Sequence, residues 1–408
     1  MGTMKLPLEG IRVVELATHV AVPMVGRLLA DWGAEVIKVE NPSGDEWRIL
    51  GRNYGVPINE DDNPVFTMPN AGKELVALNL KSAEGKEVLL KLLDEADIFI
   101  CSVRMKSMQK MGLDYDTLKK RVPKLIYAHF SGFGPEGPDA ERPGLDRAAY
   151  WAKSGAMIDF SSIGDHPINP LSGFGDATTS TMLLSGILAA LLARGKTGEG
   201  TFLNTSLYGS ALWYAGIGVV LCQEQFGGQF PKDADNPPRP LAHFYQCQDD
   251  EWIIMVSVDH DKNFPLVAKA MGLDDYLNDP RFNSSKTMDA EGHGRELTAI
   301  LQQRFRTKPS TEWAEIFAAN DLVYEPVYHV KDTVKDPQAL ANHYISNVTM
   351  PNGLEVSMST NPVQFSAYGR KAEVQHAGGI GCDTDAVLAR LGYTPQQIAQ
   401  MKADKAVK

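Results

Sequence analysis

The stretch GIRVVELATHVAVPMVGRLLADWGAEVIKV, residues 10–39, predicts a β-strand, an α-helix and a second β-strand in close succession. Residues 10–16 and 35–39 are apolar runs typical of buried strands, and residues 22–32 repeat apolar side chains at helical spacing. A helix between two strands lets them lie parallel, because it returns the chain to the edge where the first strand began. We therefore expect a β-α-β unit near the start of the chain.

The same alternation continues beyond this unit. Residues 75–80, 97–101 and 124–130 are expected to be strands, and residues 84–93 a helix. Such a pattern is typical of the α/β class, here a Rossmann-like parallel sheet with helices on both faces. The C-terminal residues are too few to bury a core alone, so we expect them to complete this large domain.

A Gly-, Pro- and Asp-rich stretch, residues 227–241, indicates a domain boundary. Beyond it we expect a strand at residues 252–258 and helices at residues 264–271, 294–305 and 310–320, which together predict a smaller α+β domain. The predicted division is therefore residues 1–225 for the large domain, 226–335 for the small domain, and 336–408 for a C-terminal segment that returns to the large domain.

The charge, cysteine content and apolar runs of the sequence limit the kinds of partner that we expect for this protein. The net charge of −11 argues against a nucleic-acid partner, which would need an extended basic face. The four cysteines, Cys101, Cys222, Cys247 and Cys382, are far apart, which favours neither a disulfide framework nor a zinc site. The start of the chain lacks a signal-peptide core, and the apolar runs 182–193 and 211–222 fall short of the ~20 residues needed to span a bilayer. We expect two core helices there, no membrane association and a cytoplasmic location.

The loop after the first strand, residues 17–23, carries no Gly-x-Gly-x-x-Gly fingerprint, so a nicotinamide dinucleotide site is disfavoured. It nevertheless follows a parallel strand, at the sheet edge where α/β proteins bind ligands. His19 belongs to this loop, where helix entry or packing is its more common role.

Asp176 stands out in LSGFGDATTS, residues 171–180, because two glycines and an acid precede an apolar run expected to be a helix over residues 178–193. A carboxylate at a helix N-terminus is favoured by the partial positive charge there, so we expect Asp176 to be ionised and able to act as a nucleophile. The alternative is an N-cap, worth about 1 kcal/mol of helix stability.

Four stretches in this order and spacing closely resemble the class III CoA-transferases, the family that contains formyl-CoA and carnitine CoA-transferases. They are WGAEVIKVE (32–40), LNLK (78–81) with Gly85-Lys86, PGLD (143–146) with AKSG (152–155), and Gly175-Asp176 with GILAAL (186–191) and TGEG (197–200). The resemblance covers nearly the whole chain. It implies an interlocked homodimer, acyl-CoA and small carboxylic acid substrates, and no cofactor or metal beyond CoA itself.

In that family the acid of the Gly-Asp step is the nucleophile, which carries over to Asp176. The resemblance implies attack on the acyl-CoA thioester, a mixed anhydride and then an aspartyl-CoA thioester. Positions that match the family's CoA-binding segments are Val20, Ala21, Asn41, Leu78, Lys81, Ser102, Val103, Arg104, Lys110, Gly144, Leu145 and Asp146. Lys81, Arg104 and Lys110 are the expected phosphate partners, with solvated surface charge as the alternative for each. Asp146 is either a second active-site acid or a turn residue.

The chain also departs from the formyl-CoA enzymes, which have Gln where Val20 stands and a glycine-rich loop where residues 236–243 are rich in proline. Residues 78–139 are most similar to the branch that acts on 2-hydroxy acids from amino-acid fermentation, such as phenyllactate and 2-hydroxyisocaproate. A racemase of 2-methylacyl-CoA would need His where Leu145 stands, so we rank the racemase function second. A non-catalytic CoA-binding protein is the third alternative, and an NAD-linked oxidoreductase is the fourth.

Overall fold

The computed structural model describes residues 5–56, 58–60, 62–228, 230–369 and 374–408. The chain forms two compact units. The first contains Met1–Ala156, Asn169–Val219 and Val334–Lys408, and the second contains Met157–Ile168 and Val220–Thr333. Residues 336–408 thus belong with the N-terminal sheet, whereas residues 157–168, which we expected in the large domain, group with the second unit.

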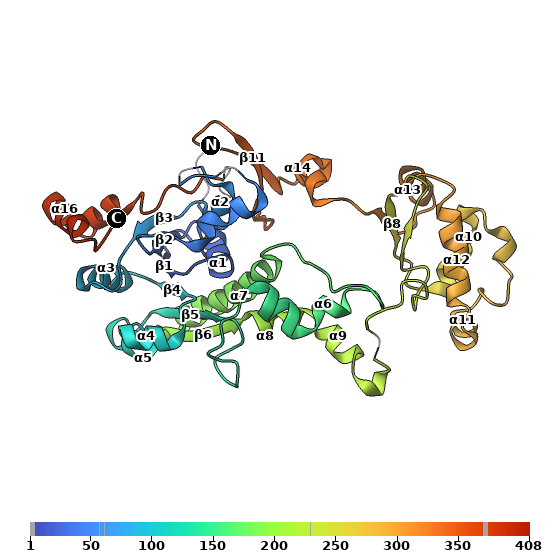
Figure 1. Cartoon of the computed structure of the whole chain (residues 1–408), viewed down its shortest axis with the longest axis horizontal. Coiled ribbons are helices and arrows are strands. Elements are labelled where there is room, and N and C mark those ends of the chain that lie inside the picture. Colours follow the sequence, from blue (N-terminus) through green and yellow to red (C-terminus); the bar gives the residue numbers. More distant parts are fainter. Residues whose placement is uncertain (1–4, 57, 61, 229, 370–373) are drawn as a thin grey trace. The chain divides into compact units, whose positions relative to one another are not determined.

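A six-stranded parallel sheet forms the centre of the first unit (Figure 1). Its strands are β1 (Arg12–Leu16), β2 (Glu35–Glu40), β3 (Glu74–Ala77), β4 (Ile98–Cys101), β5 (Ile126–Ser131) and β6 (Thr201–Ser206), in the order β3-β2-β1-β4-β5-β6. The order reverses between β1 and β4, whose Leu16 and Cys101 pair at their carboxyl ends. A ligand crevice is expected at such a reversal in an open α/β sheet.

Helices cover both faces of the sheet, as the sequence predicts. Val13 and Val14 point to opposite faces because neighbouring strand residues alternate. Val13 packs in a core with α1 (Ala21–Asp31) and α7 (Phe174–Thr197), and Val14 packs in another with α3 (Ala83–Asp94), α15 (Thr384–Arg390) and α16 (Pro395–Ala403). The C-terminal segment therefore completes the second of these cores.

Shorter elements complete the first unit. They are η1 (Glu46–Tyr54), α2 (Pro64–Asn70), α4 (Met105–Met111), α5 (Tyr115–Arg121), the π-helical turn η2 (Arg147–Ala152), α8 (Leu207–Tyr214), α14 (Pro337–Ala341) and the hairpin of β10 (Ile345–Thr349) and β11 (Glu355–Ser359). Three elements span a unit boundary: α6 (Ala156–Asp159), α9 (Gly216–Leu221) and η5 (Val330–Lys335).

The second unit is α+β. Its antiparallel sheet has the order β7-β8-β9, formed by β7 (Phe244–Gln246), β8 (Trp252–Met255) and β9 (Tyr324–Pro326). Its helices are η3 (Glu224–Phe226), α10 (His260–Met271), η4 (Asp274–Tyr276), α11 (Ser285–Glu291), α12 (Gly294–Phe305) and α13 (Ser310–Ala319). Phe305, Trp313 and Phe317 are fully buried in its core.

Two helical predictions need correction. The apolar run 182–193 is part of the 24-residue helix α7, which begins at Phe174 instead of residue 178. Among the described residues, α7 alone has a length and composition that could span a bilayer, yet it packs against α1, β5 and β6 in the first unit. Residues 211–222 do not form a core helix: they lie in α8 and α9, where Trp213 is 71% and Ile217 81% exposed.

Candidate active site

Asp176 is the third residue of α7, two residues inside the helix start. The N-cap is Gly173, whose φ of 77° lies in the left-handed region that favours glycine, and no side chain caps the helix. The N-cap alternative for Asp176 is therefore wrong. Because Asp176 is partly buried in the first helical turn, its carboxylate faces the positive end of the helix dipole without being used as a cap.

A second carboxyl group lies against the same turn. Asp146 directly precedes η2 and is 8% exposed, and both of its oxygens are buried without a hydrogen-bond partner of good geometry among the described residues. A Cβ added to Gly175 would lie 2.2 Å from Asp146 Oδ1, so glycine is required for this close approach. Asp146 thus lies against the turn that carries Asp176, and its role as a second active-site acid stays a prediction.

Both carboxyl groups hold protons more tightly than usual. Burial, reinforced by the nearby Asp146, raises the pKa of Asp176 to about 7. Burial also raises the pKa of Asp146 to about 6, although the N–H groups of Gly173 and Gly175 oppose it. The expectation that the helix N-terminus keeps Asp176 fully ionised is therefore wrong, because desolvation and a like charge outweigh the helix dipole. The Asp176 carboxyl group becomes fully ionised only above neutral pH.

Aromatic side chains enclose this pair. Tyr150 and Trp151 are both 5% exposed, and the ring centroids of Trp151 and Phe174 are 5.7 Å apart. A Cβ on Gly175 would lie 2.5 Å from Tyr150 Cγ, so the Tyr150 ring closes directly onto the turn that carries Asp176. Such packing excludes water. A reactive acyl intermediate needs this exclusion, because water would hydrolyse it.

The turn after β1 meets the start of α7. Val20 and Ala21, which begin α1, are 7% and 4% exposed. A Cβ built on Gly173 would lie 3.5 Å from Val20 Cγ1, so the Val20 side chain faces the start of α7. Two regions that the sequence analysis singled out separately, the β1–α1 turn and the Gly-Asp step, are therefore adjacent in the fold.

The remaining predicted CoA-binding residues are distributed along one edge of the sheet. Asn41 follows β2, Leu78 follows β3 and residues 102–104 follow β4, all at carboxyl ends. The Val103 carbonyl is 3.0 Å from His129 Nε2, and the Asn41 side chain accepts hydrogen bonds from Ser43. The Leu78 side chain is 1% exposed and packs in the core. It offers no side-chain surface to a ligand.

The three expected phosphate partners are exposed. Lys81 and Arg104 lie near the ends of β3 and β4, and Lys110 lies in the last turn of α4. None of the three forms an ion pair within the described ranges. Gly144 and the 63%-exposed Leu145 precede Asp146, and Gly144 approaches Gly132 after β5. Whether these residues bind CoA remains a prediction.

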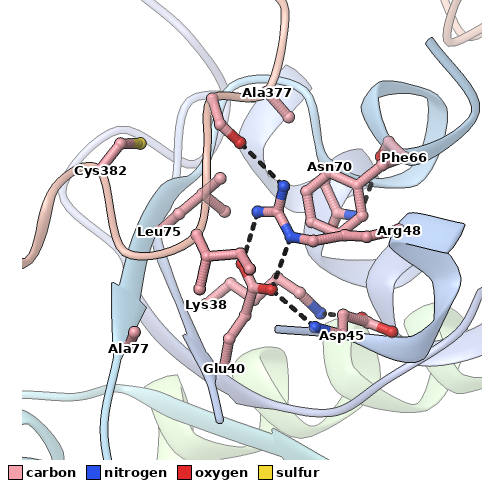
Figure 2. A network of polar contacts seen from close by, with 12 residues as sticks. Lys38, Glu40, Asp45, Arg48, Phe66, Asn70, Leu75, Ala77, Ala377 and Cys382 are labelled. Carbon is pink, nitrogen blue, oxygen red and sulfur yellow. Dashed lines mark hydrogen bonds and ion pairs between the residues drawn. The ribbon is translucent and has the colours of Figure 1, made fainter. Parts of the chain in front are cut away.

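Two groups of residues were not found from the sequence. Tyr54 at the end of η1 hydrogen-bonds Ser172, to which Arg147 also donates at 3.3 Å, so these residues gather beside Gly173. Lys38, Glu40, Asp45 and Arg48 form a buried polar network (Figure 2). Only the network had a sequence signal, since charged residues interrupt the otherwise apolar strands β1 and β2. No cluster of three or more His, Cys, Asp or Glu side chains suited to a metal occurs in the described part of the chain.

The six-stranded parallel sheet and the two neighbouring carboxyl groups, Asp146 and Asp176, place the protein in the α/β class with a candidate acidic site. Residues 8–377 match the model of CoA-transferase family III. The chain is 36% identical over 401 residues to an (R)-2-hydroxy-4-methylpentanoate CoA-transferase of Clostridioides difficile, with 98% of this chain and 99% of the relative covered. It is 34% identical to a cinnamoyl-CoA:phenyllactate CoA-transferase of Clostridium sporogenes, with 97% and 96% covered.

A solved structure agrees with the fold. A CAIB/BAIF family protein from Brucella suis superimposes with a TM-score of 0.80 at 29% identity, covering 95% of this chain and 100% of that one. The chain therefore belongs to CoA-transferase family III, and it is an enzyme of that family. The resemblance read from the sequence motifs is confirmed.

Proposed function

We propose that this enzyme moves CoA from an acyl-CoA or enoyl-CoA donor to a carboxylic acid acceptor, and that the acceptor is a 2-hydroxy acid. The acceptor class is supported by two relatives at 34–36% identity whose names specify a 2-hydroxy acid. The observation that carries the chemistry is the position of Asp176, a partly buried carboxyl group in the first turn of α7 beside Asp146.

The reaction needs only the Asp176 carboxylate and the two substrates. An Asp176 oxygen attacks the thioester carbonyl, the C–S bond breaks and CoA thiolate leaves, which forms a mixed anhydride. The thiolate then attacks the aspartyl carbonyl, releasing the donor acid and leaving an aspartyl-CoA thioester. The acceptor carboxylate displaces the thiolate to form a second anhydride, and the thiolate finally attacks the acceptor carbonyl and restores Asp176.

Each surrounding feature has a role in this scheme. Burial, reinforced by Asp146, raises the pKa of Asp176 to about 7, so the carboxylate is a better nucleophile when ionised and a poorer leaving group than an ordinary Asp. Tyr150 and Trp151 protect the anhydrides from water. Lys81, Arg104 and Lys110 are proposed to bind the CoA phosphates. We further propose that the enzyme works as a cytoplasmic homodimer and needs no cofactor beyond CoA as substrate.

Trapping the covalent intermediate tests the mechanism. The protein is incubated with an acyl-CoA, treated with hydroxylamine or borohydride and digested, and we expect the peptide containing Asp176 to be modified. Asp176→Ala should abolish transfer and trapping while CoA still binds, whereas Asp165→Asn, an exposed acid elsewhere, should behave as wild type. An unmodified peptide during active exchange would refute the scheme.

The acceptor class is tested separately. Paired 2-hydroxy acids and their 2-deoxy analogues are offered with butyryl-CoA or cinnamoyl-CoA, and the thioesters formed are identified by mass spectrometry. Preference for the 2-hydroxy member of each pair is expected. Equal or inverse preference would reject the acceptor while leaving the Asp176 chemistry intact.

A further inference from the structure

Lys38 connects the second strand of the sheet to the turn after the first. Its side chain is fully buried, and Nζ lies 3.1 Å from Glu15 Oε1 and 2.9 Å from Asp45 Oδ2. Nζ also donates to the Ala17 carbonyl at 2.8 Å. Although burial alone would lower it, Asp45 and Glu15 raise the pKa of Lys38 above its usual value, so the ammonium remains charged. Figure 2 shows Lys38 and Asp45 side by side.

Asp45 and Lys73 hold two further backbone atoms of the same turn. Asp45 Oδ1 accepts from the His19 N–H at 3.0 Å, in addition to the Trp47 N–H at 2.9 Å. Lys73 Nζ is 2.7 Å from Glu15 Oε2 and donates to the Pro23 carbonyl at 2.8 Å. The turn from Ala17 to Pro23 is thus fixed at its first, third and last residues by the buried side chains of Lys38, Asp45 and Lys73.

The turn needs such support because its conformation is unfavourable. His19 has a φ of 67°, which is uncommon for a residue with a Cβ. The next residue, Val20, faces the start of α7 at Gly173, three residues before Asp176, and α1 packs against α7. A change in the backbone at His19 would therefore move Val20 relative to the helix start that carries Asp176.

We propose that Lys38, Asp45 and Lys73 are positioning residues, which hold the Ala17–Pro23 turn in the shape that binds the CoA thioester against Asp176. The proposal rests on the proposed function. Stability alone does not explain the network, since buried ion pairs cost desolvation and apolar replacements of similar volume are often as stable. What apolar residues cannot provide is hydrogen bonds to the Ala17, His19 and Pro23 backbone.

The test compares variants of the network with variants of the turn. Asp45→Ala removes the acceptor of the His19 N–H, and we expect CoA affinity by calorimetry and kcat/KM for the donor to fall ~10-fold or more. His19→Val and His19→Asn both remove the imidazole, but only Asn adopts a positive φ readily. His19→Val should therefore weaken CoA binding severalfold more than His19→Asn. His19 is partly exposed, so this pair is informative even if Asp45→Ala fails to fold.

Arg27→Met provides the matched control. Arg27 is 3% exposed, and its side chain pairs with Asp31 and donates to the Met68 carbonyl. Among the described residues this side chain forms no hydrogen bond to the turn, so the variant should have a lower melting temperature but keep its CoA affinity. Wild-type CoA affinity in Asp45→Ala, or equal affinity in the two His19 variants, would overturn the proposal. These outcomes differ from a failure of the proposed function, in which wild-type enzyme itself would give no modified Asp176 peptide.

Discussion

At the scale of single residues, we expect the Asp146–Asp176 pair to set how the enzyme responds to pH. Burial and the nearby Asp146 raise the pKa of Asp176 to about 7, and the proposed attack on the thioester requires the ionised form. We expect kcat/KM for the CoA donor to rise with pH and level off above about pH 7. In Asp146→Asn a like charge is removed, so the pKa of Asp176 falls and the acidic limb of the profile moves to lower pH.

The measurement is the profile of each variant normalised to its own plateau, with severalfold greater relative activity expected for Asp146→Asn at pH 6. Glu136→Gln, an exposed change in the loop after β5, is the control and should leave the midpoint in place. An unmoved or higher midpoint in Asp146→Asn would show that the two carboxyl groups do not interact.

At the scale of secondary-structure elements, the Asp176 carboxyl group makes the stability of α7 depend on pH. A carboxyl group whose pKa rises from its ordinary 3.8 to about 7 on folding contributes stability that is complete below pH 3.8 and is lost as pH rises through about 7. Asp176→Asn is neutral throughout, so it should melt higher than wild type by at least ~2 °C at pH 8, with a smaller gain at pH 5. Differential scanning calorimetry of both proteins decides this, and Asp165→Asn should show no pH-dependent difference.

The same helix shows what the sequence could and could not predict. The β1-α1-β2 unit and the apolar part of α7 follow from periodicity, and Asp176 follows from its glycine-rich context. The first turn of α7 was missed because Gly173, Phe174 and Gly175 do not resemble a helix start. The approach of Asp146 to Gly175 and the contact of Tyr54 with Ser172 were not predictable, since both depend on how loops distant in sequence meet in the fold.

At the scale of the whole molecule, the exposed apolar residues of α8 and α9 favour a second copy of the chain as partner. Trp213 is 71% and Ile217 81% exposed, and soluble monomers rarely leave such side chains adjacent and uncovered. α8 packs against α7 and η2, and the Tyr214 hydroxyl lies 2.8 Å from Thr181 Oγ1 on α7. A partner that covers α8 would therefore also support the helix that carries Asp176.

Analytical ultracentrifugation at micromolar concentration should give the mass of a dimer for the wild-type protein. The double substitution Trp213→Glu with Ile217→Glu places two buried charges in the proposed interface, so it should shift the protein toward monomer and lower transfer activity in parallel. Lys120→Glu alters charge on the exposed face of α5 and should change neither. A wild-type monomer at these concentrations would reject the homodimer. A double variant that stays dimeric and active would show that the dimer interface does not lie at α8.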